Sequence, residues 1–372
     1  MFEIVEEAGR FYAPAPGQMV FTYKEIDRPD GGLPRTISFT NVDCVPLNYE
    51  QLVTARGQEE LTIPLDLRNA RIVDTDIEGI GPSLFAHIKA TLTTPFTADA
   101  IGLVRGGWVP SALSAVRPET MVILDRNVVT EIISRFDGGA LKGRAPDFLD
   151  IFGQSPVQIN PCLYAMEGSD QALPDPQHVR DELERAIDKL TKALPQAHLI
   201  VSDQSIDGML GLLEEARETF LKRQAFLMRV AQLLEAPIAQ SRVKTVWGQV
   251  VEAAARCGVE PQSIVLLAAL SVAVTPKAGP ARDLLKFRRG YSERIAYNAL
   301  CDIRALEYLL NLHGLHPDQP IQLCTQDLGM AKFWVAMGAN VVRQNGRLEM
   351  TMTPHEALLG EQNLARWNAL QG

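Results

Sequence analysis

The hydrophobic pattern along the chain predicts two buried strands that each lead into an acidic residue. The continuous apolar run Met-Val-Ile-Leu at residues 121–124 ends on Asp125, and the amphipathic segment after it is typical of a helix. Residues 321–324, Ile-Gln-Leu-Cys, are also strand-like and are followed by a turn that contains Asp327 and by the start of another helix. Open α/β sheets bind their ligands at the carboxyl ends of their strands. The pattern therefore predicts an α/β fold with a parallel sheet flanked by helices, and with Asp125 and Asp327 at its functional edge.

The remaining pattern divides the chain into two parts. Residues 1–115 contain short alternating runs rich in Pro, Gly, Thr and Val, which predict a β-rich N-terminal extension of short strands and loops with one helix near 83–93. No function is assigned to this extension. The α/β pattern occupies residues 116–372 and is interrupted at about 177–280, where a nearly continuous helical period predicts a large helical insertion.

Composition and charge exclude several classes of protein. The longest apolar stretch, residues 263–274, is shorter than the roughly 20 residues that span a bilayer, so no membrane partner is expected. The first residues, Met-Phe-Glu-Ile-Val-Glu-Glu, lack the features of a signal peptide, which predicts a cytoplasmic protein. Five cysteines without close pairing favour reduced thiols over a disulfide framework. A net charge of −9 argues against a broadly basic nucleic-acid surface, although a local basic patch can still attract a polyanion.

Two more acids are positioned to reach the same edge of the sheet. Asn160 is a good N-cap for a helix over 162–167, and Glu167 is the last residue of that helix. Asp302 lies inside the long helix that begins at 293, one turn after Asn298. An aspartate in a helix interior is mildly unfavourable, so Asp302 is either a solvated acid paired with a neighbouring base or a member of a site.

Four segments give these acids a defined order along the chain. They are Val122-Ile-Leu-Asp-Arg-Asn, Ile159-Asn-Pro-Cys-Leu-Tyr-Ala-Met-Glu-Gly, Tyr297-Asn-Ala-Leu-Cys-Asp and Cys324-Thr-Gln-Asp-Leu-Gly-Met-Ala-Lys-Phe-Trp. Together they resemble the PIN domain nucleases, in which one acid follows the first strand, two lie on helices and a fourth follows a later strand. The resemblance covers roughly residues 120–172 and 292–345, and implies a PIN-like fold enlarged by the insertion and the extension.

The resemblance also implies which residues form the site. The four acids are Asp125, Glu167, Asp302 and Asp327, as both catalytic residues and metal ligands, and the supporting polar groups are Asn127, Thr325 and Asn298. Two carboxylates about 4 Å apart repel by several kcal/mol at an effective dielectric near 20, so four that converge need a cation. Oxygen ligands select Mg²⁺ or Mn²⁺, and one or two such ions can activate a water for attack on a phosphodiester.

The implied activity is that of a metal-dependent endoribonuclease. The implied substrate is RNA, or single-stranded nucleic acid generally, while a second copy of the chain and an inhibitor protein stay open as partners. The densest basic cluster in the chain could bind the phosphate backbone, with its aromatic residue stacking on a base; it consists of Lys286, Phe287, Arg288 and Arg289. Lys332, one turn after Asp327, could also contact a phosphate, although a simple surface lysine is the favoured alternative. The alternative for the cluster is a solvated helix end with Phe287 packed inward.

Two other functions compete with the nuclease. A haloacid dehalogenase-type phosphatase needs an Asp-x-Asp pair, but the second position after Asp125 is Asn127, which cannot act as a general acid. Asp74-Thr-Asp76 supplies an intact pair, although an exposed turn explains it equally well. The third function is a non-catalytic interaction protein that uses the helices of the insertion as its surface. No zinc, dinucleotide or phosphate-loop motif is present in the sequence.

Overall fold

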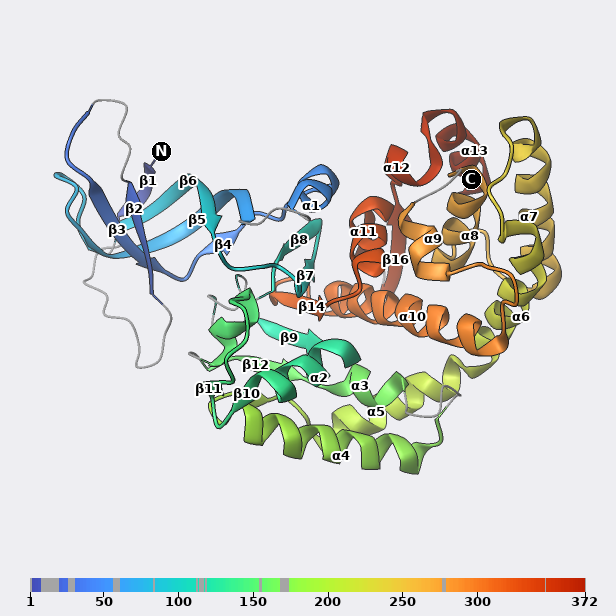
Figure 1. The fold of residues 1–372 in the computed structure, drawn as a ribbon, viewed down its shortest axis with the longest axis horizontal. Helices are drawn as coiled ribbons and strands as arrows, with labels where there is room; N and C mark the ends of the chain where they lie inside the picture. The colour runs from blue at the N-terminus through green and yellow to red at the C-terminus, as the bar shows by residue number, and fades with distance from the viewer. Residues whose placement is uncertain are drawn as a thin grey trace.

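The chain is a mixed α/β protein whose two main sheets are joined to an array of helices (Figure 1). Its computed structural model describes residues 2–7, 20–25, 31–55, 61–82, 84–111, 113, 117, 119–153, 156–167, 174–275, 279–344 and 346–371. Within these residues, no helix is both long and apolar enough to cross a membrane. All five cysteines are free thiols, as the sequence predicts.

The N-terminal part forms an antiparallel sheet in the order β1-β6-β5-β3-β2, with β4 paired to β5. Its strands are β1 (Phe2–Glu7), β2 (Phe21–Glu25), β3 (Arg35–Thr40), β4 (Asp43–Cys44), β5 (Leu61–Thr75) and β6 (Leu84–Thr94), and the short helix α1 (Tyr49–Ala55) lies between β4 and β5. The prediction of a helix near 83–93 is wrong, because that segment is strand β6. Ala86 and Ile88 are buried while Lys89 is exposed, and the Thr-rich end of the segment favours a strand.

The second sheet carries the two strands that end on acids. Its order is β13-β12-β9-β14-β7-β8, and β13, β12, β9 and β14 are parallel. The bounds are β7 (Ile101–Val104), β8 (Gly107–Pro110), β9 (Met121–Leu124), β12 (Gln158–Asn160), β13 (His198–Leu199) and β14 (Ile321–Thr325). From β9 the chain adds β12 and β13 on one side, and β14 joins on the other, so the order in which strands are added reverses between β9 and β14. This is the switch point at which open α/β sheets bind ligands.

Helices cover both faces of the second sheet. Val122 and Leu124 of β9 belong to a core with α2 (Arg126–Arg135) and α4 (Pro176–Ala193). Ile123, which points to the opposite face, belongs to the main core with α3 (Cys162–Glu167), α10 (Glu293–Leu315) and α11 (Leu328–Met337). Side chains alternate between the faces of a strand, so the continuous apolar run of β9 reflects burial on both sides.

Strand pairing crosses two of the boundaries expected from the sequence. The β7–β8 hairpin pairs with β14, so residues 101–110 belong to the second sheet although they precede the expected boundary at 115. At the other junction, α4 leads into β13, which pairs with β12, so the segment 177–199 is part of the α/β unit and not of the insertion. The two-residue strand β13 is too short to give a periodic signal.

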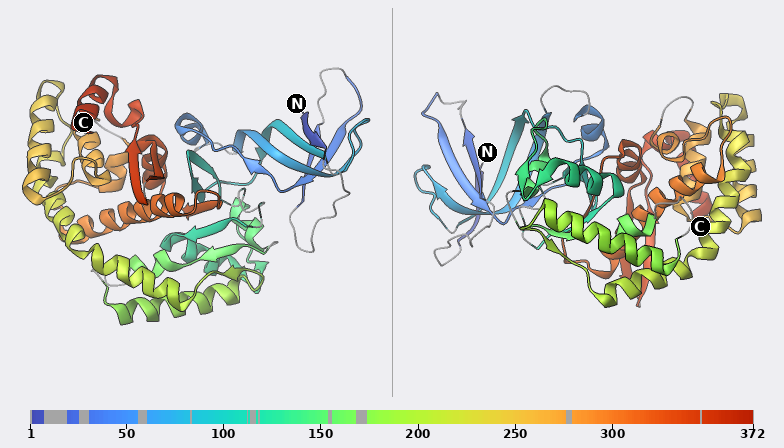
Figure 2. Two further views of the ribbon diagram at one scale, coloured as in Figure 1. Left: turned by 180° about the vertical axis from the view of Figure 1, so that it is seen from behind. Right: turned by 60° about the horizontal axis from the view of Figure 1, so that its bottom comes forward.

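The helical insertion begins at α5 and packs against the end of the chain. Its helices are α5 (Asp203–Glu215), α6 (Arg217–Leu234), the 3₁₀ helix η3 (Gln240–Arg242), α7 (Val243–Cys257), α8 (Ile264–Val274) and α9 (Pro280–Leu285). After α11 come the hairpin β15 (Ala339–Gln344) and β16 (Arg347–Met352), and the helices α12 (Glu356–Leu359) and α13 (Glu361–Gln371). Helix α8 contacts α6, α7, α9 and α12. Figure 2 shows α6, α7 and α8 at the opposite end of the molecule from the N-terminal sheet.

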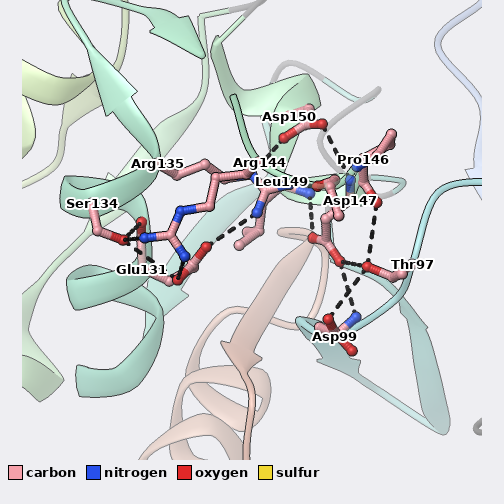
Figure 3. A network of polar contacts seen from close by, with 11 residues as sticks. Thr97, Asp99, Glu131, Ser134, Arg135, Arg144, Pro146, Asp147, Leu149 and Asp150 are labelled. Carbon is pink, nitrogen blue, oxygen red and sulfur yellow. Dashed lines mark hydrogen bonds and ion pairs between the residues drawn. The ribbon is translucent and has the colours of Figure 1, made fainter. Parts of the chain in front are cut away.

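A polar network ties the connection between the two sheets to α2 (Figure 3). The small hairpin β10 (Phe136–Asp137) and β11 (Ala140–Leu141) and the 3₁₀ helix η2 (Phe148–Gly153) follow α2. Arg135 pairs with Asp150 at 2.5 Å and with Glu131 at 3.1 Å. Asp147 accepts hydrogen bonds from Thr97 Oγ1 at 2.6 Å and from the backbone N–H of Asp99 at 3.0 Å. The buried carboxylates therefore fix the segment that enters β7.

Candidate active site

Asp125 and Asp327 lie side by side at the switch point of the second sheet. The backbone N–H of Asp125 donates to Cys324 O at 3.0 Å, which aligns the ends of β9 and β14. Thr325 Oγ1 donates to Asp125 Oδ2 at 2.8 Å and accepts from the backbone N–H of Asp327 at 3.0 Å. The Thr325 hydroxyl thus links the two strand ends, in agreement with its expected supporting role.

Each of these acids also caps a helix. Asp125 Oδ1 accepts from the backbone N–H of Arg126 at 2.7 Å at the start of α2. Asp327 Oδ1 accepts from the backbone N–H of Met330 at 2.9 Å at the start of α11. A cap bond occupies one carboxylate oxygen and holds the other in a fixed direction. The two strand ends therefore present oriented carboxylates at the positive ends of two helices.

Asp302 joins them through a shared lysine. Lys286 Nζ lies 3.5 Å from Asp327 Oδ2 and 4.0 Å from Asp302 Oδ2. Burial raises the pKa of Asp302 well above its usual range, and the charges of Asp327, Asp125 and Glu167 raise it further, while Lys286 lowers it. Asp302 therefore shares Lys286 with Asp327, and the charges of the other three acids act on its partly buried carboxylate.

Glu167 completes the cluster from the end of α3. Burial raises its pKa, Asp125 raises it further, and the cations Arg126, Arg304 and Lys286 lower it. Burial likewise raises the pKa of Asp125; the bonds from Thr325 and Arg126 lower it, whereas Asp327 raises it. The four predicted acids therefore act on one another electrostatically, although they lie after β9, at the end of α3, within α10 and after β14.

Helix α10 fixes the end of α3 on which Glu167 lies. Tyr297 Oη donates to Glu167 O at 2.7 Å, and Arg304 Nη2 donates to Met166 O at 2.6 Å. Phe220 of α6 packs its ring 5.4 Å from the ring of Tyr297 and lies under the Arg304 guanidinium at the same centroid distance. The insertion thus supports the residues that hold Glu167.

The two expected asparagines differ in their surroundings. Asn298 Oδ1 is buried on α10, one turn before Asp302, and accepts no hydrogen bond from any described residue. Asn127 is exposed on α2, and within the described part of the chain no hydrogen bond joins its side chain to an acid. The supporting role expected for Asn127 therefore stays a prediction, because no such contact joins its side chain to the acids among the described residues.

The predicted substrate-binding cluster is split by the fold. Phe287 is only 4% exposed and packs its ring 4.9 Å from that of Tyr291, so the prediction that it stacks on a base is wrong. Arg288 and Arg289 are exposed beside it. Lys332 is half-buried on α11, and no ion pair between it and the four acids occurs among the described residues. Phe287 faces inward because it belongs to the main hydrophobic core, whereas Lys286 and Arg288 on either side of it are exposed.

Two arginines near the site were not among the predicted site residues. Arg126 stacks over the Tyr164 ring at 4.5 Å and pairs with Glu182 at 3.6 Å, and Arg304 holds the end of α3 as described above. Each arginine is close in sequence to a predicted acid, Arg126 next to Asp125 and Arg304 two residues after Asp302. This proximity was the available signal, but helical direction decides which group an arginine reaches.

Known proteins offer no guide to the site. Comparisons of the chain with models of protein families, with curated proteins and with solved structures found no significant match. Among the described residues, no three Asp, Glu, His or Cys side chains are grouped as direct ligands of one metal ion. The chemistry of the site has to be argued from its own contacts.

Proposed function

We propose that this chain is a metal-dependent nuclease with a PIN-like active site, acting as an endoribonuclease. The observation that carries the proposal is geometric: Thr325 joins Asp125 and Asp327 at the switch point of the sheet, and Lys286 lies within 4.0 Å of both Asp327 and Asp302. Glu167 acts on this group through its charge. Assembling four carboxylates from four separate elements costs stability through desolvation and repulsion. Such an arrangement is expected where a cation is used, because the cation offsets both costs.

The donor atoms fit a hard divalent cation. All four acids offer carboxylate oxygens, and the buried Asn298 Oδ1 adds an acceptor without a donor. Mg²⁺ and Mn²⁺ prefer oxygen ligands, and Mg²⁺ is often bound by one or two direct carboxylates while keeping several waters. Asp125 and Asp327, which the caps orient, are the direct ligands in this proposal, and Glu167 and Asp302 act directly or through water. A site of this kind needs no set of three direct protein ligands.

The chain's own residues would align the substrate for attack. A bound Mg²⁺ or Mn²⁺ would supply an activated water and stabilise the leaving oxygen of the phosphodiester. Thr325 holds Asp125 in place, and Arg304 and Tyr297 hold the carbonyl groups at the end of α3. The exposed Arg288 and Arg289 follow Lys286 in the chain and are suited to contact the phosphate backbone. The preference for RNA is carried by the family resemblance.

The contacts of the Asp74-Thr-Asp76 segment do not favour the phosphatase alternative. Asp76 of the intact Asp-x-Asp pair is exposed in the N-terminal sheet, where it accepts bonds from the backbone N–H and the hydroxyl of Thr36 at 2.7 Å each. Those bonds stabilise the pairing of β3 with β5, which is a structural use of the side chain. The scaffold alternative predicts that the chain binds no divalent cation.

The test compares the wild type with Asp125→Asn and Asp327→Asn. Asparagine preserves both helix caps, so the variants should fold and lose only the charge of one ligand. Each protein is incubated with single-stranded RNA, single-stranded DNA and a phosphomonoester, with and without Mn²⁺. We expect Mn²⁺-dependent RNA cleavage by the wild type and a loss of at least about a hundredfold in both variants.

A matched control removes a charge elsewhere. Asp188 is exposed on α4, and Asp188→Asn should cleave like the wild type. Undiminished cleavage by both site variants would refute the assignment of the acids. Hydrolysis of the phosphomonoester without cleavage of either polynucleotide would indicate a phosphatase instead, and a wild type without metal binding or cleavage would favour the scaffold.

A further inference from the structure

Lys286 has a backbone conformation that lysine rarely adopts. It follows the last residue of α9 with φ 55° and ψ 33°, in the left-handed region. Glycine is the common residue at such a helix end, and a residue with a Cβ is strained there. In the described part of the chain, the only other non-glycine residues with positive φ are Asn41 and Asn69, and asparagine tolerates this region well. A lysine in this strained conformation points to a use for its side chain.

The fold holds Lys286 against the acids from both sides. Leu285 before it is fully buried and Phe287 after it is 4% exposed, so both neighbours anchor the backbone of Lys286 to the core. Helix α9 approaches the first turn of α11 so closely that a Cβ on Gly329 would lie 2.8 Å from Asp283 Cβ and 3.1 Å from Asp327 Oδ1. Arg282 Nη1 also donates to Leu234 O at 3.2 Å, which ties α9 to α6.

The ammonium therefore occupies the position where a cation serves the cluster. It lies within 4.0 Å of carboxylate oxygens from two different elements, Asp302 of α10 and Asp327 at the start of α11. Its side chain is 49% exposed, so it has room to leave. A cation of charge +2 placed between the same oxygens would repel an ammonium at this distance strongly.

We propose that Lys286 is the built-in counter-ion of the acid cluster and that it competes with the divalent cation for Asp302 and Asp327. Without metal, the ammonium offsets the repulsion between the carboxylates and keeps the site assembled. Metal binding then requires Lys286 to swing outward, so the lysine lowers metal affinity. This inference rests on the proposed metal-dependent function and adds a residue that sets the affinity for the metal.

The test measures Mn²⁺ binding directly by isothermal titration calorimetry, independently of cleavage. Lys286→Met removes the charge, Lys286→Asn removes it while suiting the left-handed backbone, and Lys286→Arg keeps it. We expect roughly tenfold tighter Mn²⁺ binding by both neutral variants and near wild-type binding by the arginine variant. The control Lys244→Met removes one exposed charge from α7 and should leave Mn²⁺ affinity unchanged. Thermal unfolding in EDTA should show a lower Tm for Lys286→Met than for Lys286→Arg, since both carry the same backbone strain and differ in charge, and Mn²⁺ should restore it.

The outcomes separate this inference from the proposed function. Wild-type Mn²⁺ binding with unchanged affinity in both neutral variants would overturn the competition while leaving the nuclease proposal intact. Weaker binding in the neutral variants would overturn it as well, because it would make Lys286 a support of the metal site. If neither the wild type nor any variant binds Mn²⁺, both proposals fail. Binding by the neutral variants alone would support the competition most strongly.

Discussion

The charge of Asp302 is costly to the folded chain. Burial and three neighbouring carboxylates raise its pKa, and Lys286 is the one cation among the described influences that lowers it. The ion pair with Lys286 is long, at 4.0 Å, and the lysine is half exposed. A surface pair of this kind contributes little, so it cannot offset the repulsion fully.

Replacing Asp302 by asparagine should therefore stabilise the metal-free protein. Asparagine has a similar shape and helix propensity, and it removes the buried charge. We expect the free energy of unfolding at neutral pH to rise by an amount on the order of 1 kcal/mol, measured by urea denaturation in EDTA. A loss of similar size would instead show that the pair with Lys286 is a net stabilising contact. Added Mn²⁺ should stabilise the wild type more than the variant.

His313 predicts a second effect at the residue scale, away from the site. Burial in α10 lowers its pKa to about 4, and its Nε2 lies 3.0 Å from Ile321 O. In the unfolded chain a histidine has a pKa of about 6.5. The unfolded state therefore binds more protons between these values, and stability falls as the pH falls from about 6.5 toward 4. The neutral ring contributes fully only above that window.

The loss attributable to His313 should reach on the order of 3 kcal/mol near pH 4. Because the acids of the cluster shift in the opposite direction, the useful quantity is the difference between wild type and His313→Gln. Urea denaturation across the window should show the wild type losing stability more steeply than the variant. Parallel curves would contradict a buried neutral histidine.

At the scale of elements, the contact between α9 and α11 positions the cluster. Gly329 permits this contact, because a Cβ there would overlap Asp283. Gly329→Ala should push the helices apart and lower the free energy of unfolding by about 1–3 kcal/mol. The matched control is Gly248→Ala in α7, where a Cβ meets nothing within 4 Å and should raise stability by up to about 1 kcal/mol. Chemical denaturation of both variants decides the matter; equal gains would mean that α9 and α11 are free to separate.

The sequence predicted those elements whose signal is local. The apolar run before Asp125, the helix start at Asn160 and the Asp327 turn are all found, because burial on two faces and helix caps each leave a mark within a few residues. Strand β6 was mistaken for a helix, because few of its side chains are buried and its alternation of buried and exposed positions is weak. Strand β13 is too short to leave any pattern and exists only through its pairing with β12.

For the candidate site, the sequence predicted the four acids but not the cations that lie beside them. The order of the four acids along the chain was sufficient to expect their convergence. The place of Lys286 depends on the approach of α9 to α11, which joins residues about forty positions apart and leaves no periodic trace. Likewise, the inward direction of Phe287 follows from a core that includes α6, α8 and α9, and a basic cluster alone gives no sign of it.

At the scale of the whole molecule, the charge balance opposes the proposed substrate. The chain carries a net charge of −9, so an RNA is repelled overall and has to be held by a local patch. Arg288 and Arg289 are exposed, follow Lys286 closely in the chain and have no ion-pair partner among the described residues. If they contact phosphates, each contact releases counter-ions and makes binding depend on salt.

Removing both arginines should therefore weaken RNA binding and flatten its salt dependence together. In an Asp125→Asn background, which prevents cleavage, fluorescence anisotropy with labelled single-stranded RNA gives the slope of log K against log salt. Arg288→Gln with Arg289→Gln should reduce that slope by about 1.4, since each phosphate contact to a single strand contributes about 0.7. Arg242→Gln with Lys244→Gln removes two exposed charges near the start of α7 and should leave the slope unchanged. Equal changes in both double variants would mean that RNA responds to the total charge of the molecule and not to a patch beside the acids.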